Sequence, residues 1–526
     1  FSAYGTAGGE ELWVSDGSAA GTLEVADLYP GSSSSSPKDL TAFGSALLFA
    51  ADAPPPGSPA SDVGEELWIT DGTSAGTDLL SETSDLSSGV KELAWVGSLA
   101  FFVANDSIHG EELWISDGTP GGTLLVDIRP GDAGSSPSAL TEFQGRLFFA
   151  ATDGVNGQEL WVSDGTVAGT EILGDLEAGT GSSSPRDLVA TAERLFFTAE
   201  VGLEGRELWS SDGTAAGTAL VEDIWAATEE SSSPSYLTVV GSQVFFAATD
   251  DVHGEELWVS DGSEAGTLLV ADLQPGTSSS RPESLTDAGG TLFFRADNGI
   301  DGRELWISDG TAAGTSQVVD LRPGSSSGFS GVLAALGSLV IFRGNDGIHG
   351  DEPWVSDGTA AGTLPLLDIS PGLTSSLPGE FTAHGDGIYF AAYDPAAGRE
   401  LFYTDGTPGG TALFADLAPG PGDSLPLHLV SNGEQLFFTA FDPANGREVW
   451  SSKGTVESTV RRTDVWAGAG SSEPSLLSPS PDGTWLYFAA WREDVWEEPF
   501  RLNFSAIFSD GFESGDTSAW SSIVNE

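Results

Sequence analysis

The stretch from Leu147 to Thr170 reads LFFAATDGVNGQELWVSDGTVAGT, and close relatives of it recur along the 526-residue chain. The copies are 46 to 49 residues apart, except that an insertion reading APPPGSPAS lengthens the first interval to 55. Repetition at this period predicts one repeat architecture in place of several unrelated domains. Phe402 replaces the tryptophan of ELW once, and a degenerate last copy ends at Trp496. We predict that this tryptophan lies in the core of each repeat, at Trp13, Trp68, Trp114, Trp161, Trp209, Trp258, Trp306, Trp354 and Trp450.

Each repeat contains four short apolar runs bounded by Gly, Asp, Ser or Pro. The first follows a Ser-rich stretch and a proline, as from Pro137 to Leu140. The second is LFFAA or a relative, the third is ELWVS, and the fourth ends at an aspartate before Pro-Gly, as at Asp127. Short aromatic and β-branched runs between turn residues are typical of strands, and no segment has an apolar period of 3.6 over a helical length. The sequence therefore predicts an all-β chain.

Four strands in each repeat of about 48 residues match the blade of a β-propeller. One such sheet is too small to bury enough apolar surface alone, so its aromatic residues must pack against neighbouring sheets. We expect a large β-propeller of about 10–11 blades, with two smaller rings or an open array as alternatives. The array is expected over residues 1–506, with FSAYGT as the second strand of an incomplete first blade and RLNFSAIF as the last fourth strand. The tail over 507–526 would be a closing strand or an export or surface signal.

The chain is strongly acidic, with 19 Lys and Arg against 79 Asp and Glu and a formal charge of -60. Such a polyanion repels phosphate backbones and anionic lipid surfaces, which argues against nucleic acid as a partner. No apolar run approaches the roughly 20 residues of a membrane span, so we expect no membrane insertion. The chain has no Cys and no Met, even at its first residue. Removal of a signal peptide is the simplest reading, which predicts an extracellular or cell-surface bacterial protein.

The SDGT element joins the third and fourth apolar runs. Asp-Gly is a strong turn signal, because Gly accepts positive φ and the Asp side chain can cap backbone amides. It resembles the Asp-box turns of sialidase propellers, which are structural. We therefore interpret these aspartates as structural turn residues: Asp16, Asp71, Asp117, Asp164, Asp212, Asp261, Asp309, Asp357 and Asp405.

A second acidic element joins the second and third apolar runs, where an Asp precedes a Glu by six residues with a Gly between them. Two carboxylates around such a loop could supply oxygens to calcium, which accepts six to eight of them in flexible geometry. The alternative is a solvated turn whose Glu starts the next strand and bonds the loop backbone. The candidate calcium ligands are Asp106, Glu112, Asp153, Glu159, Asp250, Glu256, Asp346, Glu352, Asp394, Glu400, Asp442 and Glu448.

The string ELWVSDGTVAGT, with LFFAATDGVNGQ before it and a DL or DI plus PG after the next run, resembles the ELWxxDGT repeat family of secreted bacterial proteins. The resemblance covers nearly the whole chain, from Phe1 to about Phe500. It implies a propeller-like surface or extracellular protein, and it carries no catalytic motif that could be transferred. The last copy departs from the family: SPDGTWLYFAA looks more like a TolB-type propeller strand pair.

The sequence contains no cysteine nucleophile, no HExxH, no GxSxG and no phosphate-cradling loop, and its carboxylates recur in register. We therefore expect no catalytic residue and no enzyme, but a structural or adhesive propeller that acts as a binding or assembly module. Calcium would stabilise it, and a cell-surface protein, a polysaccharide or further copies of the chain in a filament would be its partners. The alternative is an extracellular carbohydrate-active hydrolase or lyase that uses the propeller face.

Overall fold

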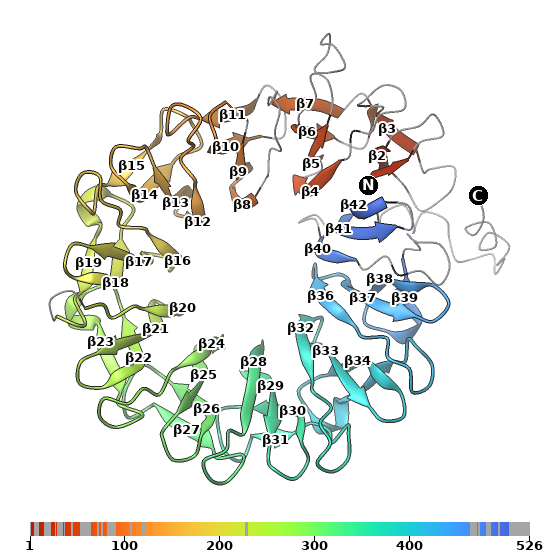
Figure 1. Cartoon of the computed structure of the whole chain (residues 1–526). Helices are drawn as coiled ribbons and strands as arrows, with labels where there is room; N and C mark the ends of the chain where they lie inside the picture. The colour runs from red at the N-terminus through yellow and green to blue at the C-terminus, as the bar shows by residue number, and fades with distance from the viewer. Residues whose placement is uncertain are drawn as a thin grey trace. The chain divides into compact units, whose positions relative to one another are not determined.

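The computed structural model describes residues 122–226 and 230–462, with shorter stretches between 2 and 117 and between 471 and 503. These residues form eleven antiparallel sheets in tandem, nine of four strands and two of three (Figure 1). Within each sheet the strands pair in chain order or its reverse, so each sheet is a meander. The prediction of an all-β chain with tandem four-stranded sheets of the propeller type is confirmed. No helix of the described residues is long and apolar enough to cross a membrane.

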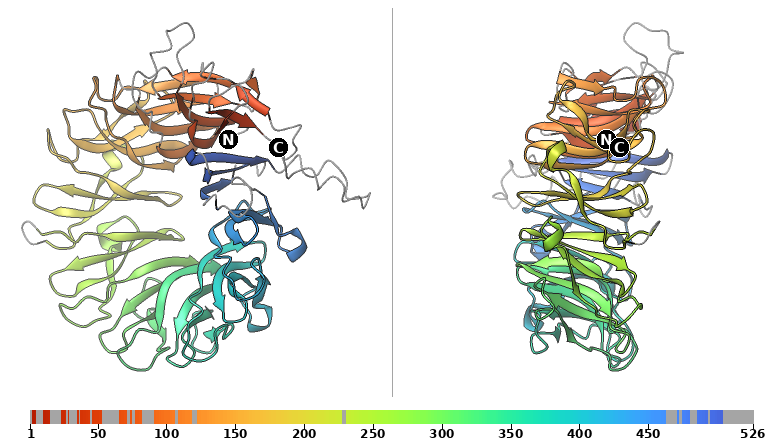
Figure 2. Two further views of the ribbon diagram at one scale, coloured as in Figure 1. Left: turned by 45° about the vertical axis from the view of Figure 1, so that its right-hand side comes forward. Right: turned by 90° about the vertical axis from the view of Figure 1, so that its left-hand side faces the viewer.

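The chain divides into two compact units, which are described separately. Unit 2 contains residues 94–97 and 135–426 and carries six consecutive sheets, which follow one another as layers from yellow to cyan in Figure 2. Its strands are β12 (Ser138–Phe143), β13 (Arg146–Thr152), β14 (Gln158–Ser163), β15 (Thr170–Gly174), β16 (Arg186–Ala190), β17 (Leu195–Val201), β18 (Gly205–Ser211), β19 (Ala219–Glu222), β20 (Ser235–Val240), β21 (Gln243–Asp250), β22 (Gly254–Ser260), β23 (Leu268–Ala271), β24 (Glu283–Ala288), β25 (Thr291–Asp297), β26 (Arg303–Ser308), β27 (Ser316–Val319), β28 (Phe329–Leu336), β29 (Leu339–Asn345), β30 (Asp351–Ser356), β31 (Leu364–Pro365), β32 (Gly379–His384), β33 (Gly387–Asp394), β34 (Gly398–Thr404) and β35 (Ala412–Ala415). Short 3-10 helices lie before some fourth strands: η3 (Ala215–Gly217), η4 (Glu264–Gly266) and η5 (Pro408–Gly410).

Unit 1 contains residues 1–93, 98–134 and 427–526, and so joins the two ends of the chain. Within it β4 lies beside β41 and β42, and β1 lies beside β42. Its strands are β1 (Ser2–Tyr4), β2 (Glu10–Val14), β3 (Leu23–Ala26), β4 (Lys38–Phe43), β5 (Ala46–Asp52), β6 (Glu65–Thr70), β7 (Thr77–Ser81), the first half of β8 (Lys91–Val96), β9 (Leu99–Asn105), β10 (Glu111–Ser116), β11 (Thr123–Val126), β36 (Leu427–Ser431), β37 (Leu436–Asp442), β38 (Gly446–Ser452), β39 (Val460–Arg461), β40 (Ser475–Pro479), β41 (Trp485–Arg492) and β42 (Val495–Asn503), with η6 (Val456–Ser458) before β39.

Among the described residues, the two sheets nearest the chain ends have three strands each. The strands β1–β3 correspond to the second, third and fourth strands of the other sheets, and FSAYGT contains β1, the equivalent of a second strand, as its alignment predicts. The assignment of RLNFSAIF as a fourth strand is wrong at its start, because Arg501 and Asn503 belong to β42, the third strand of its sheet. Residues from Phe504 onward, including the tail, lie outside the described part of the chain.

In most sheets the Phe of the second strand is paired with the Trp of the third, whereas Phe390 is paired with Phe402 in the sheet β32–β35. Phe197 is the cross-strand partner of Trp209, and their rings stack with centroids 6.4 Å apart. Aromatic pairs of this kind stabilise a sheet beyond the area that they bury. Indole N–H groups also need acceptors when buried, and Trp161 Nε1 donates to the Ala151 carbonyl across the strand pair at 3.0 Å. Trp114, Trp306 and Trp450 donate to the equivalent carbonyl, whereas the buried indole N–H groups of Trp68 and Trp258 have no hydrogen-bond partner among the described residues.

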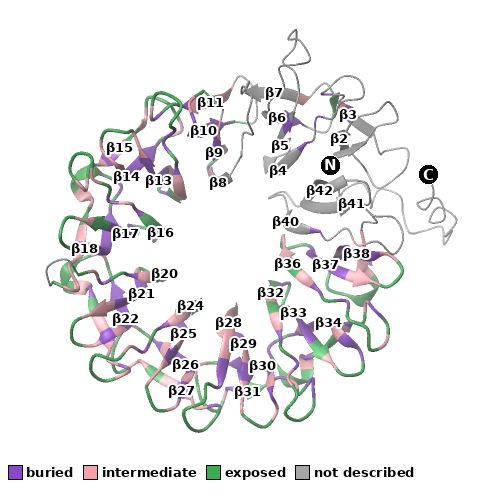
Figure 3. Ribbon diagram, viewed as in Figure 1, coloured by how far each residue is buried: buried purple, intermediate pink, exposed green. Residues whose placement is uncertain are grey.

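Consecutive sheets of unit 2 pack face to face through these aromatic residues. In one cluster, Phe196 and Leu208 of one sheet contact Phe246 and Trp258 of the next. The same arrangement recurs through the unit, where the buried residues alternate with exposed loops (Figure 3). Burial of each aromatic side chain contributes roughly 1.5–3 kcal/mol, so stability is shared between neighbouring sheets. Seven of the ELW tryptophans are buried as expected, with exposures of 5–8%: Trp68, Trp114, Trp161, Trp209, Trp258, Trp306 and Trp354. Trp450 is only half-buried, and the side chain of Trp13 lies outside the described residues.

The SDGT aspartates close the turn between the third and fourth strands. Asp405 accepts hydrogen bonds from the backbone N–H of Thr407 at 2.9 Å and from its hydroxyl at 2.6 Å, and these bonds hold the pKa of Asp405 below its usual value. Thr407 then caps η5 through the N–H of Gly410. The same contacts are found at Asp164, Asp212, Asp261, Asp309 and Asp357, whereas Asp16 and Asp71 lie outside the described residues.

This turn leaves no room for a side chain at its last glycine. A Cβ on Gly410 would lie 2.1 Å from atoms of the Asp405 carboxylate, whereas a Cβ on the adjacent Gly409 would meet nothing within 4 Å. We expect Gly410→Ala to lower the free energy of unfolding by about 1–2 kcal/mol, because the carboxylate must leave Thr407. Chemical denaturation should show no loss for the matched Gly409→Ala, since Ala216 occupies that position in another repeat. Equal effects of the two substitutions would contradict this account.

Candidate functional site

The Glu of each ELW sequence anchors the crossover segment that leads from one sheet to the next. Glu256 accepts hydrogen bonds from the backbone N–H groups of Leu273 and Ser280, at 3.1 and 3.0 Å, and from the Ser280 hydroxyl at 2.5 Å. The side chain is fully buried, and burial raises its pKa to about 7. Glu159, Glu207, Glu304, Glu352 and Glu400 accept equivalent bonds from residues 17 and 24 positions downstream, except that the second partner of Glu207 lies 25 positions downstream.

The Asp that precedes each Glu has different partners. Asp250 accepts from the N–H groups of Val252 and His253, and its second oxygen lies 2.7 Å from His253 Nδ1. It therefore closes its own turn, whereas Glu256 faces the crossover. The structure places the other candidate ligands in the same way: Asp153, Asp346, Asp394 and Asp442 bond their turns, Glu112, Glu159, Glu352, Glu400 and Glu448 are buried, and Asp106 lies outside the described residues.

Within the described residues, no group of three or more His, Asp or Glu is arranged to hold a metal ion. The two carboxylates of a pair such as Asp153 and Glu159 satisfy separate backbone donors in this structure. Calcium binding by these loops stays a prediction.

The first strands of successive sheets in unit 2 lie next to one another and carry a repeated bulge. In β24 the register shifts between Glu283 and Thr286, and Ser284 adopts a φ of 55°. Left-handed backbone in residues other than Gly is uncommon and clusters at functional sites, and bulges redirect side chains. The residues at this position in unit 2 differ from sheet to sheet, in contrast to the repeating core: Ala139, Asp187, Tyr236, Ser284 and Glu380.

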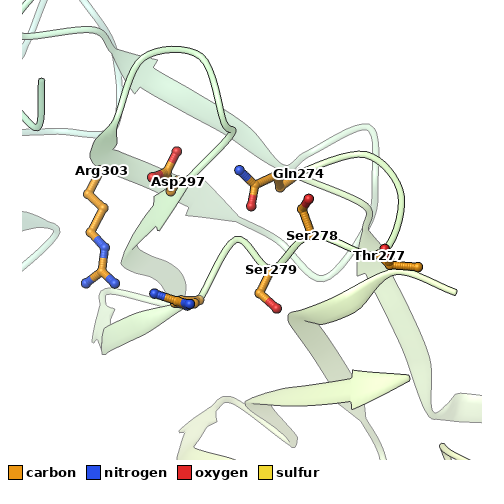
Figure 4. Close-up of a pocket in the computed structure, with 7 residues that line it drawn as sticks. Gln274, Thr277, Ser278, Ser279, Asp297 and Arg303 are labelled. Carbon is orange, nitrogen blue, oxygen red and sulfur yellow. The ribbon is translucent and has the colours of Figure 1, made fainter. Parts of the chain in front are cut away.

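A polar cavity of about 460 Å³ lies beside this row of strands, between the crossover that precedes β24 and the turn that joins β25 to β26. The crossover contributes Gln274, Ser278 and Arg281, and the ends of the two strands contribute Asp297 and Arg303. Figure 4 shows Asp297 and Arg303 on one side of it, with Gln274, Ser278, Ser279 and Thr277 on the other. The volume is within the range of about 300–1,000 Å³ for small-molecule sites. We refer to it as the crossover pocket.

Several charged side chains lie at or near the crossover pocket, and two arginines there share one carboxylate. Arg295 and Arg303 both contact the same Glu283 oxygen, at 2.6 and 2.5 Å. Ser279, which also lines the pocket, accepts a hydrogen bond from the N–H of Glu255 at 3.0 Å. Burial raises the pKa of the Glu255 carboxyl, while Arg281 and Arg303 oppose that rise. Glu255 does not line the pocket itself, but its backbone bonds the lining residue Ser279 and its carboxyl interacts electrostatically with the lining residues Arg281 and Arg303.

This pocket was not predicted from the sequence, because the predicted sites were acidic residues that recur in each repeat. The signal was the reverse: Arg281 is one of only 19 cationic residues and is uncommon at its repeat position, whereas Arg303 is matched by Arg206, Arg399 and Arg447. Ser136, Ser184 and Ser233 occupy the position of Arg281 in other sheets. Departures from the repeat in an otherwise regular chain would have pointed to this crossover.

No protein-family model matches the chain, and no curated protein does. Solved structures that resemble it include a puromycin hydrolase, at 15% identity and a TM-score of 0.35, aligned over 76% of this chain and 58% of that one. A structure from a study of two prolyl endopeptidases aligns at 11% identity and a TM-score of 0.37, over 77% of this chain and 55% of that one. This chain thus spans less than two thirds of the length of either structure.

These comparisons correct one expectation from the sequence. We expected a structural or adhesive module without enzymatic activity, whereas the similar structures are a hydrolase and an endopeptidase. The structural and adhesive interpretation is contradicted by this finding and is not carried further. The resemblance to the ELWxxDGT family stays a prediction.

Proposed function

We propose that the chain is part of an extracellular carbohydrate-active hydrolase or lyase, and that the crossover pocket binds its polysaccharide substrate. The observation that carries this proposal is the lining of the pocket, which combines the amide of Gln274, the hydroxyls of Ser278 and Ser279 and the carboxylate of Asp297. Such groups both donate and accept hydrogen bonds, as sugar hydroxyls require. The extracellular location rests on the resemblance to secreted repeat proteins.

An exposed aromatic ring supports a substrate of this kind. Tyr236 is 55% exposed on β20, the first strand beside β24. An amphipathic ring exposed on this neighbouring strand offers an apolar face on which a sugar ring can stack. The first-strand row would then hold the polysaccharide while the crossover pocket holds one of its residues.

Two carboxyl groups suit the chemistry. Glycoside hydrolysis commonly uses a protonated carboxyl as general acid and an ionised carboxylate as base or nucleophile. Glu255, whose pKa is raised by burial, is the proposed general acid, and Asp297, which lines the pocket, is the proposed carboxylate.

The test is an assay of a polysaccharide panel for new reducing ends and for the ultraviolet absorbance of unsaturated uronates. We expect at least one polysaccharide to be cleaved, and Glu255→Gln to lower the rate by about 10²–10⁴-fold, as for loss of a general acid. Asp351→Asn is the matched control, because Asp351 holds the same repeat position at the start of β30. Absence of cleavage across the panel, or equal rates for the two variants, would refute the proposal.

A further inference from the structure

Arg281 occupies a strained backbone position at the mouth of the crossover pocket. Its φ is 51°, in the left-handed region that side-chain-bearing residues rarely adopt. The other sheets of unit 2 with this feature place Ser or Leu there, as at Ser233 and Leu377. The conformation belongs to the repeat, but the guanidinium is particular to this sheet.

The Arg281 guanidinium is also unpaired. Within the described part of the chain it has no hydrogen-bond or ion-pair partner, whereas Arg295 and Arg303 share Glu283. The side chain is exposed and lines the pocket. The chain has a net charge of -60 and repels anions over most of its surface, whereas an unpaired guanidinium attracts them locally.

We infer that the crossover pocket takes a sugar that carries a carboxylate, a uronate residue, and that Arg281 binds this carboxylate. The inference rests on the proposed function and specifies its substrate class. A guanidinium matches the planar carboxylate through two parallel N–H donors. Gln274 and Ser278 lie on the same crossover and would meet the ring hydroxyls.

The net charge of the chain also favours one class of acidic polysaccharide over another. A densely sulfated or phosphorylated polymer brings several negative charges near the acidic surface, and this repulsion is only partly screened within the Debye length of about 8 Å at physiological salt. A single carboxylate on each sugar carries less charge and matches one free guanidinium. Uronate polymers, with one negative charge on each sugar, therefore fit this site better than polysulfates.

Binding is tested by calorimetry with oligomers of galacturonate, mannuronate, guluronate and glucuronate, each against its carboxyl-reduced neutral counterpart. We expect at least one uronate oligomer to bind more tightly than its neutral counterpart, by about 10-fold or more. Arg281→Ser should reduce that affinity about 10–100-fold, towards the neutral level, as expected for loss of a charged hydrogen-bond pair. Serine is the residue of three other sheets at this position, which keeps the backbone conformation accessible.

Arg322→Gln is the matched control, because it removes one positive charge from the next crossover and places there the residue found at Gln274. It should leave uronate affinity unchanged. If acidic and neutral oligomers bind equally, or if Arg281→Ser and Arg322→Gln have the same effect, the assignment of Arg281 is overturned while the proposed carbohydrate function stands. If no oligomer binds and no polysaccharide is cleaved, both are overturned.

Discussion

The folded protein should become more stable as the pH is lowered from about 8 to about 5, because three buried glutamates favour their protonated form. Burial raises the pKa of Glu207, Glu256 and Glu304 from 4.5 to about 7. Between these values the folded chain binds more protons than the unfolded chain, so stability falls as pH rises. Each group contributes at most about 3 kcal/mol, from 1.36 kcal/mol per pKa unit, and this contribution is lost as the pH passes through about 7. Urea denaturation across the pH range measures the effect.

A triple variant distinguishes the effect of these three buried carboxyls on stability from the effect of the chain's overall negative charge. Glutamine at positions 207, 256 and 304 keeps a hydrogen-bonding side chain but cannot ionise, so the pH dependence between about 5 and 8 should become much flatter. The control changes three exposed glutamates to glutamine, at Glu204, Glu264 and Glu434, and so removes the same charge from the surface. The same pH dependence in the two triple variants would show that the buried glutamates do not titrate as described.

Replacement of Trp258 by alanine should lower the free energy of unfolding by about 3–5 kcal/mol, the range for loss of a large buried aromatic residue. Trp258 is 7% exposed and packs with Phe196 and Leu208 of the preceding sheet, so the cavity would weaken the contact between two sheets. Stability in stacked repeats is largely the sum of such interfaces. Chemical denaturation with tryptophan fluorescence and circular dichroism gives the measurement.

Val252→Ala is the control for Trp258→Ala, since Val252 lies in a turn of the same sheet and is 54% exposed. It should change the stability by less than about 0.5 kcal/mol. A Trp258→Ala protein as stable as this control would contradict the packing of consecutive sheets through their tryptophans.

The fold could be predicted because the period of the sequence and the turn chemistry agree. The Asp-Gly pair after Trp161 and the Phe pair before it mark strand ends by local rules, and repetition multiplies the signal. The role of Glu256 could not be predicted in the same way. Its partners Leu273 and Ser280 lie 17 and 24 residues downstream, and only the stacking of the sheets brings that crossover back to it.

The candidate site was harder to predict than the fold for a related reason. Arg281 stands out only by comparison with the serines at the same repeat position, and its left-handed backbone lies just before the bulge of β24. The candidate calcium ligands were chosen because Asp and Glu recur together. In the folded chain Asp250 and Glu256 serve two different segments, so recurrence reflected two local requirements.

The bond between each buried glutamate and the crossover ahead of it also bears on how such a chain can evolve. Because Glu256 and Ser280 are matched by Glu400 and Ser424 in a distant sheet, duplication or deletion of one whole repeat would regenerate the same junction. Recombination between repeats would thus preserve folding while exchanging the few variable positions. A new binding specificity could then arise by mutation of a single repeat, while the other repeats keep the sequence that folding requires.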